Sequence, residues 1–256
     1  MDRPRLALLN AAHEAADTRR NFRRELDASL DVFHVPAGEL PDGLHYDGFV
    51  VTGSSASVYW DREWIGELKT WVGDAVRAGL PALGVCFGHQ LLADVLGGSV
   101  KGMGEYELGY RTVQQDGTNR LLEGIDETMT VFMSHSDHVT DAPPGSTVFA
   151  SNEYGIQGFQ RDRAFGVQFH PEYDMDTAET ITRGKSDQVS PELIESVLEG
   201  IHAENYAKAC EAKALFDNFL AFVKDVQRAR IDTARSRSDL DGGCDETTYR
   251  ENGPPG

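Results

Sequence analysis

Apolar and polar positions repeat with two different periods over the first 98 residues. Longer stretches with apolar residues three and four apart predict helices, most clearly at 64–79, where glycine ends the pattern. Short apolar runs bounded by turn-forming residues predict four buried strands, at 5–10, 30–35, 46–55 and 82–85. Strands that alternate with helices of this length predict βαβ units and a doubly wound, mostly parallel sheet.

The pattern changes after this region. Residues 99–169 contain short strand-like runs separated by turn signals such as "QDG", "APPG" and "RDR", which predict an antiparallel extension of the sheet. Residues 190–231 have helical spacing and predict a C-terminal helical extension. The stretch 232–256 lacks periodicity and predicts a disordered tail. We therefore expect one α/β domain over residues 1–231.

Charge and composition narrow the classes of partner. The net charge of −18, from 42 acidic and 24 basic residues, argues against nucleic acid or an anionic membrane as a partner, because phosphate contacts need a basic face. The acidic, lysine-poor composition is similar to that of halophilic-type proteins from salt-loving archaea; an ordinary acidic cytosolic protein is the alternative. The N-terminal apolar run is too short for a signal peptide, and no run is long enough to span a bilayer. We expect a soluble, cytoplasmic protein.

One of the three cysteines lies in a setting typical of a nucleophile. In "PALGVCFGHQLLADVLGG", Cys86 stands at the bend from a predicted strand into a predicted helix, where a thiolate gains from the positive end of the helix. Such an elbow needs small neighbours two residues away on each side, and these are Gly84 and Gly88. The alternative is a buried structural cysteine in a tight turn.

A base and an orienting carboxylate follow later in the chain. In "GVQFHPEYD", His170 comes after a predicted strand, and Pro171 makes the turn to Glu172 rigid. An imidazole held by a carboxylate is what a cysteine nucleophile needs for proton transfer. Either motif alone is weak, but together they predict a Cys-His-Glu triad.

These motifs resemble the class I (triad-type) glutamine amidotransferases, within which the chain is most similar to the stand-alone branch related to the GMP synthase glutaminase domain. "GVCFGHQLLADVLGG" and "GVQFHPE" carry the resemblance, and "VVTGSSASVYW", "EYELGYRTV" and "MSHSDHV" agree with it over 49–172. The resemblance implies the family's flavodoxin-like fold.

The resemblance also implies roles for individual residues. Cys86 attacks the side-chain amide of glutamine and forms a glutamyl thioester, His170 serves as base and acid, and Glu172 orients it. Ammonia then passes to a separate synthetase subunit. The implied oxyanion hole uses backbone N–H groups at Gly53 and Phe87, and the implied substrate contacts come from Gln90, Ser134 and His135. The run Gly53-Ser54-Ser55-Ala56 lacks the two consecutive glycines common in the family's oxyanion loop.

Two alternatives to this function remain open. The first is a self-sufficient γ-glutamyl hydrolase or peptidase that acts on γ-glutamyl amides without a partner. The second is a non-catalytic regulatory protein on the same fold, which the intact triad argues against. No cofactor is expected. His135 and His138 raise the possibility of zinc, but no third ligand follows at a recognisable spacing, so we expect no metal.

Overall fold

The computed structural model describes residues 3–241, which build a nine-stranded sheet in the order β2-β1-β3-β4-β9-β8-β7-β5-β6. The first five strands in this order are parallel, and the remaining four extend the sheet with antiparallel pairings. Both halves of the predicted sheet are therefore confirmed. The strands are β1 (Arg5–Asn10), β2 (Ser29–His34), β3 (Gly48–Val51), β4 (Ala82–Val85), β5 (Ser99–Gln115), β6 (Thr128–Asp141), β7 (Thr147–Asn152), β8 (Gly155–Arg161) and β9 (Ala164–Val167).

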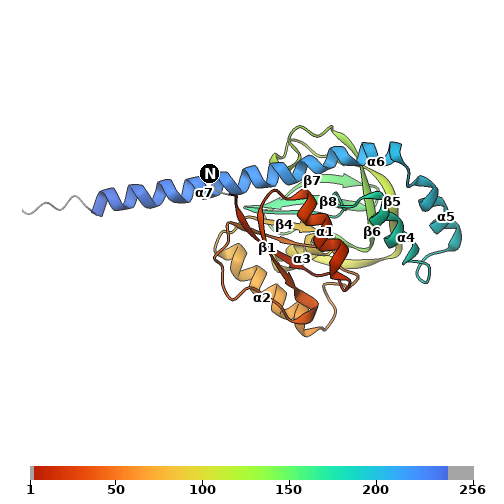
Figure 1. Ribbon diagram of the computed structural model, residues 1–256, viewed down its shortest axis with the longest axis horizontal. Helices are drawn as coiled ribbons and strands as arrows, with labels where there is room; N and C mark the ends of the chain where they lie inside the picture. The colour runs from red at the N-terminus through yellow and green to blue at the C-terminus, as the bar shows by residue number, and fades with distance from the viewer. Residues whose placement is uncertain (1–2, 242–256) are drawn as a thin grey trace, which may run out of the picture.

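Helices cover both faces of the parallel half (Figure 1). Because successive strand residues point to opposite faces, Leu6 and Leu8 pack under α1 (Ala15–Glu25) and α7 (Ala214–Asp241). Ala7 and Leu9 belong to the other core, under α2 (Glu63–Arg77) and α3 (Phe87–Val95). The doubly wound arrangement thus follows from central strands that are apolar on both faces.

A third, smaller core lies on the antiparallel half. Leu108 of β5 and Phe132 of β6 pack against Ala178 of α4 (Met175–Arg183) and Val197 of α5 (Pro191–Gly200). Helix α5 falls within the predicted helical extension, whereas α4 was not predicted. This core brings α4 to the carboxyl end of β9, where the chain leaves the sheet.

The C-terminal helices complete the structure. Helix α6 (Ala203–Cys210) precedes α7, whose apolar stripe lies on the sheet and includes Phe216, Phe219 and Val223. The far end of α7 extends away from the body (Figure 1). The helix continues to Asp241, so the first ten residues of the predicted tail are helical instead of disordered, and 242–256 lie outside the described residues. Within residues 3–241, no helix combines the length and the apolar character required to cross a membrane.

Candidate active site

Cys86 occupies the turn between β4 and α3 with a backbone conformation that L-residues rarely adopt. Its φ is 53° and its ψ is −103°, and it caps the N-terminus of α3. The predicted need for small neighbours is confirmed. A Cβ on Gly84 would stand 2.3 Å from the carbonyl oxygen of Gly88, and one on Gly88 would stand 2.2 Å from that of Val51. The strained elbow is therefore possible only with glycine at both positions.

The sheet places the second motif beside this elbow. Strands β4 and β9 are parallel neighbours, with Val85 paired to Val167, and the Cys86 N–H donates to the carbonyl of Val167 at 2.9 Å. The carboxyl ends of both strands thus meet at the edge where open α/β sheets bind ligands. His170 lies three residues after the end of β9, and its backbone N–H donates to the carbonyl of Phe132 at 2.9 Å.

His170 and Glu172 form a buried pair. The Nδ1 of His170 lies 2.8 Å from Oε1 of Glu172, and both side chains are almost inaccessible to solvent. Burial on its own lowers the pKa of His170, but the charges of Glu172 and Cys86 and the hydrogen bonds to both outweigh it and raise the pKa to about 10. With Nδ1 engaged, Nε2 is the nitrogen available for proton transfer at the reacting atoms.

Helix α1 holds the turn that carries Glu172. One terminal nitrogen of Arg24 donates to the backbone carbonyl of Glu172 at 2.6 Å, and the other donates to Oδ2 of Asp174 at 2.7 Å. Asp174 also caps α4, accepting from the Thr177 N–H at 2.8 Å. Burial raises the pKa of Asp174, but the hydrogen bonds from the hydroxyl and the backbone N–H of Thr177, followed by the charges of Arg24 and Arg20, lower it overall.

The aromatic ring of Tyr173 lies flat against the imidazole of His170. The ring centroids are 4.1 Å apart, and the planes differ by 15°. Burial, followed by the negative charges of Glu172 and Cys86, raises the pKa of the Tyr173 hydroxyl well above its usual range, so the phenol stays neutral. Nothing in the sequence pattern pointed to this contact.

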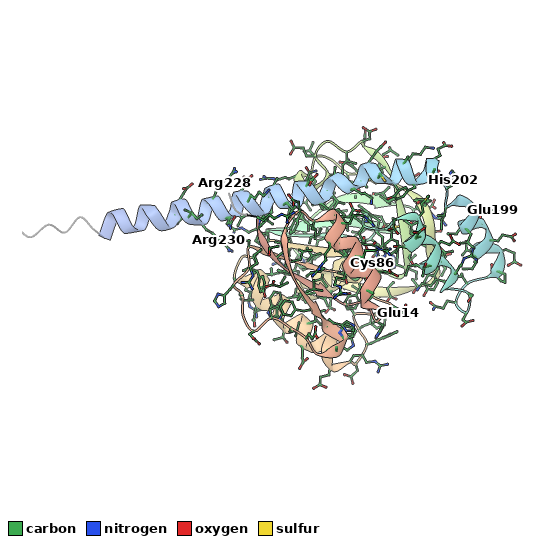
Figure 2. All side chains as sticks on the ribbon, viewed as in Figure 1. Glu14, Cys86, Glu199, His202, Arg228 and Arg230 are labelled. Carbon is green, nitrogen blue, oxygen red and sulfur yellow. The ribbon has the colours of Figure 1, made fainter. Side chains whose placement is uncertain are left out.

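A cavity of about 410 Å³ opens over the candidate triad, and Gly53, Cys86, Ser134, His170 and Glu172 contribute to its wall. A Cβ on Gly53 would lie 3.7 Å from Cβ of Cys86 and 2.8 Å from Cε1 of His170, so this loop stands directly against the reacting groups. Figure 2 shows Cys86 inside the body with Glu14, another wall residue, toward the surface. The outer wall further includes His13, Asp17 and Thr18 on the α1 side, and Thr177, Thr180, Ile181, Lys185 and Gln188 on the α4 side.

The side chains of Gln90 and His135 are not among the residues that line this cavity. The side chain of Gln90 is buried and donates to the carbonyl of Asp137 at 2.8 Å and to Oε1 of Gln168 at 3.1 Å. His135 is also buried, with Nε2 at 2.8 Å from Oε2 of Glu107 and Nδ1 at 2.9 Å from the Asp137 carbonyl. Both side chains are thus engaged with other protein groups, and of the three residues only Ser134 lines the cavity.

The structure also shows the positions of Phe87 and His138. Phe87 is the first residue of α3, where backbone N–H groups have no partner within the helix, and its side chain is buried against Trp64. His138 uses Nδ1 to contact the carbonyl of Tyr154 at 3.0 Å. In the part of the chain that the structure describes, no group of three His, Cys, Asp or Glu side chains could hold a metal ion.

Comparisons with known proteins found a matching family model and similar chains. The family model "Glutamine amidotransferase class-I" matches residues 19–184. The glutamine-hydrolysing GMP synthase of Burkholderia vietnamiensis is 38% identical over 134 residues, which cover 48% of this chain and 24% of that protein. The corresponding protein of Vibrio vulnificus is 35% identical over 129 residues, covering 49% and 24%. The chain thus spans about a quarter of the length of these curated relatives.

Solved structures show the same fold. A glutamine amidotransferase from Thermotoga maritima superposes with a TM-score of 0.73 at 23% identity, covering 86% of this chain and 99% of that one. A glutamine amidotransferase from Methylobacillus flagellatus gives a TM-score of 0.67 at 20% identity, covering 85% and 96%. At these identities the likeness concerns the fold alone.

Proposed function

The chain belongs to the class I glutamine amidotransferase family, and from that membership we propose that Cys86, His170 and Glu172 hydrolyse the side-chain amide of glutamine. The observation that carries this proposal is the buried His170–Glu172 pair set against a cysteine in a strained strand–helix elbow. A charged imidazole beside a cysteine sulfur favours the thiolate, which is the reactive form.

The reaction proceeds through a covalent intermediate. The sulfur of Cys86 attacks the amide carbon, and the carbonyl electron pair moves to oxygen. Backbone N–H groups of Phe87 and of the Gly53 loop stabilise this oxyanion. The C–N bond then breaks, and the imidazolium of His170 donates its proton to the departing nitrogen, which leaves as ammonia. Water attacks the resulting thioester while His170 accepts its proton, and glutamate leaves as the Cys86 sulfur is regenerated.

The ammonia goes to a synthetase partner in this proposal. The support is that the curated relatives are named as glutamine-hydrolysing GMP synthases, of which this chain matches about a quarter. A partner that consumes ammonia would raise the rate of glutamine hydrolysis when it binds.

A second candidate, a self-sufficient γ-glutamyl hydrolase, is favoured by the size of the cavity. Its volume of about 410 Å³ falls in the range of sites that hold drug-sized ligands, and glutamine is smaller than these. The cavity wall also includes Lys185 and Gln188, whose polar side chains could contact the part of a γ-glutamyl substrate beyond the glutamyl group.

One assay separates the candidates. Ammonia release from glutamine, and amine release from γ-glutamyl dipeptides, are measured with the wild-type protein and with Cys86→Ala. Release from glutamine alone, increased by a synthetase, supports the amidotransferase, and efficient cleavage of dipeptides without a partner supports the hydrolase. If neither substrate gives Cys86-dependent release across a range of salt concentrations, both enzymatic proposals are wrong and a regulatory role remains.

A further inference from the structure

The stacked ring of Tyr173 differs from every other close ring pair among the described residues. The others are tilted or edge-on, with centroids at least 5.0 Å apart, which is the usual preference of aromatic rings. Tyr173 and His170 instead stack face to face at 4.1 Å. A cation prefers the face of an aromatic ring, where the negative part of the quadrupole lies.

The surroundings of Tyr173 hold it in this position from both sides along the chain. Arg24 donates to the carbonyl of Glu172 and to the carboxylate of Asp174, the two residues that flank Tyr173. Phe132 also packs against the ring of Tyr173, at a centroid distance of 5.9 Å, and Tyr110 meets Phe132 edge-on at 5.2 Å. The ring of Tyr173 therefore has a second aromatic neighbour besides His170.

We propose that Tyr173 is a positioning residue that stabilises the charged form of His170 through its ring face and so favours the reactive Cys86–His170 ion pair. This inference rests on the proposed function for its catalytic meaning, but its physical content concerns the ionisation of the pair alone. The ring lies on the imidazole face, so it leaves Nδ1 to Glu172 and Nε2 to the substrate. Its hydroxyl has no part in the effect.

Apart from Tyr110, which one control variant replaces, the other titratable groups near His170 are the same in every variant of the test. Cys86 and Glu172 face it directly. His170 lines the catalytic cavity and also a small cavity of about 10 Å³ behind it. The other titratable side chains on these two walls are His13, Glu14, Asp17, Lys185, Tyr110, Tyr206 and Lys213.

The test compares Tyr173→Leu, which removes the ring, with Tyr173→Phe, which keeps it. Alkylation of Cys86 by iodoacetamide is followed as a function of pH by mass spectrometry of the Cys86 peptide. In Tyr173→Leu the pH of half-maximal reactivity should rise by about 0.5 to 1.5, because the imidazolium that pairs with the thiolate loses its support. The alkaline limit of kcat/KM for glutamine should fall for the same reason. Tyr173→Phe should keep both values of the wild type.

A matched control separates the electrostatic effect of the Tyr173 ring face from a general loss of aromatic packing. Tyr110→Leu removes a ring of the same aromatic cluster that does not stack on His170, and it should leave both pH values unchanged. Tyr173→Met refills the same space with a flexible side chain and replaces Tyr173→Leu if that variant folds poorly. The proposal is overturned if ring removal at position 173 leaves the alkylation midpoint in place, or if Tyr110→Leu moves it equally. A shifted midpoint without any glutamine hydrolysis would contradict the proposed function and leave this inference standing.

Discussion

His89 is a buried histidine that the proposed mechanism does not use. It follows the elbow in α3, has no exposed surface and lies beside the ring of Phe159, at a centroid distance of 5.0 Å. A Cβ on Gly166 would stand 2.7 Å from its Nδ1, so the ring fills its space tightly. Burial lowers the pKa of His89 to about 3, although a contact with the Gly166 backbone opposes this shift and the nearby His135 adds to it. The imidazole is therefore neutral in the folded protein at every pH near neutrality.

This histidine should make the fold sensitive to acid. Its folded pKa of about 3 lies below the unfolded value of about 6.5, so the unfolded chain binds more protons between these pH values. Stability is complete above pH 6.5 and falls as the pH decreases toward 3. We expect His89→Met to reduce the loss in unfolding free energy between pH 7.5 and 4.5 by about 2.7 kcal/mol.

Urea denaturation at the two pH values measures this effect. His45→Met, a change at an exposed histidine, is the control and should lose stability with acid as the wild type does. Equal acid sensitivity in His89→Met and the wild type would show that burial of His89 has no such consequence.

At the residue scale, the sequence predicted the strained backbone turn at Cys86. It did not predict which side chains point into the cavity. Cys86 was predictable because only glycine fits at Gly84 and Gly88. The direction of the His135 side chain was not predictable, because neighbours along β6 point to opposite faces: Ser134 lines the cavity while His135 turns inward to Glu107. The register that pairs His135 with Glu107 depends on a bulge in β5, which spacing alone does not reveal.

At the scale of elements, the contact between α1 and α4 determines how the triad turn is held. Arg24 belongs to α1 and binds two points of the turn that leads into α4. Asn21, one helical turn earlier, donates to Oγ1 of Thr177 in α4 at 3.0 Å. The orientation of the Glu172 carboxylate thus depends on a helix about 150 residues away in the chain.

Removal of this clamp should lower the catalytic rate more than substrate affinity. In Arg24→Met the turn loses both hydrogen bonds, and we expect kcat for glutamine hydrolysis to fall about tenfold while KM changes little, since small misplacements of reacting groups are costly. Arg23→Met, the adjacent exposed arginine of α1, is the matched control and should retain the wild-type kcat. A normal kcat in Arg24→Met would show that the turn holds its shape without α1.

The elements that sequence patterns missed are those stabilised by tertiary contacts. Helix α4 has only nine residues and several threonines, which favour helix weakly; it is held by the Asp174 cap and by packing of Ala178. The first half of β5 contains glycines and charges that resemble a loop, yet pairing with β6 keeps it extended from Ser99. By contrast, the central parallel strands β1, β3 and β4 are buried on both faces and read as short apolar runs, so their sequence alone identified them.

At the scale of the whole molecule, acidic residues greatly outnumber basic ones. The chain has 42 acidic against 24 basic residues, so even complete pairing would leave 18 negative charges without a partner of opposite sign. Many ion pairs of the structure are exposed, such as Arg77–Asp74 and Lys208–Glu204, and such pairs contribute little each. Salt screens these pairs as well, but because each contributes little, the larger effect of salt is to screen the repulsion among the excess carboxylates.

We therefore expect KCl to stabilise this fold. The unfolding temperature, followed by circular dichroism, should rise by about 5–10 °C between dilute buffer and 2 M KCl, which corresponds to roughly 2–3 kcal/mol for a chain of this size. Sucrose, a neutral excluded solute, is the control that separates charge screening from general solvent effects. Most of the gain below 1 M KCl would indicate simple screening, since the Debye length is then already about 3 Å. A continued rise above 1 M would support the hydrated carboxylate surface of a salt-adapted protein, and equal stability in dilute buffer would refute salt adaptation.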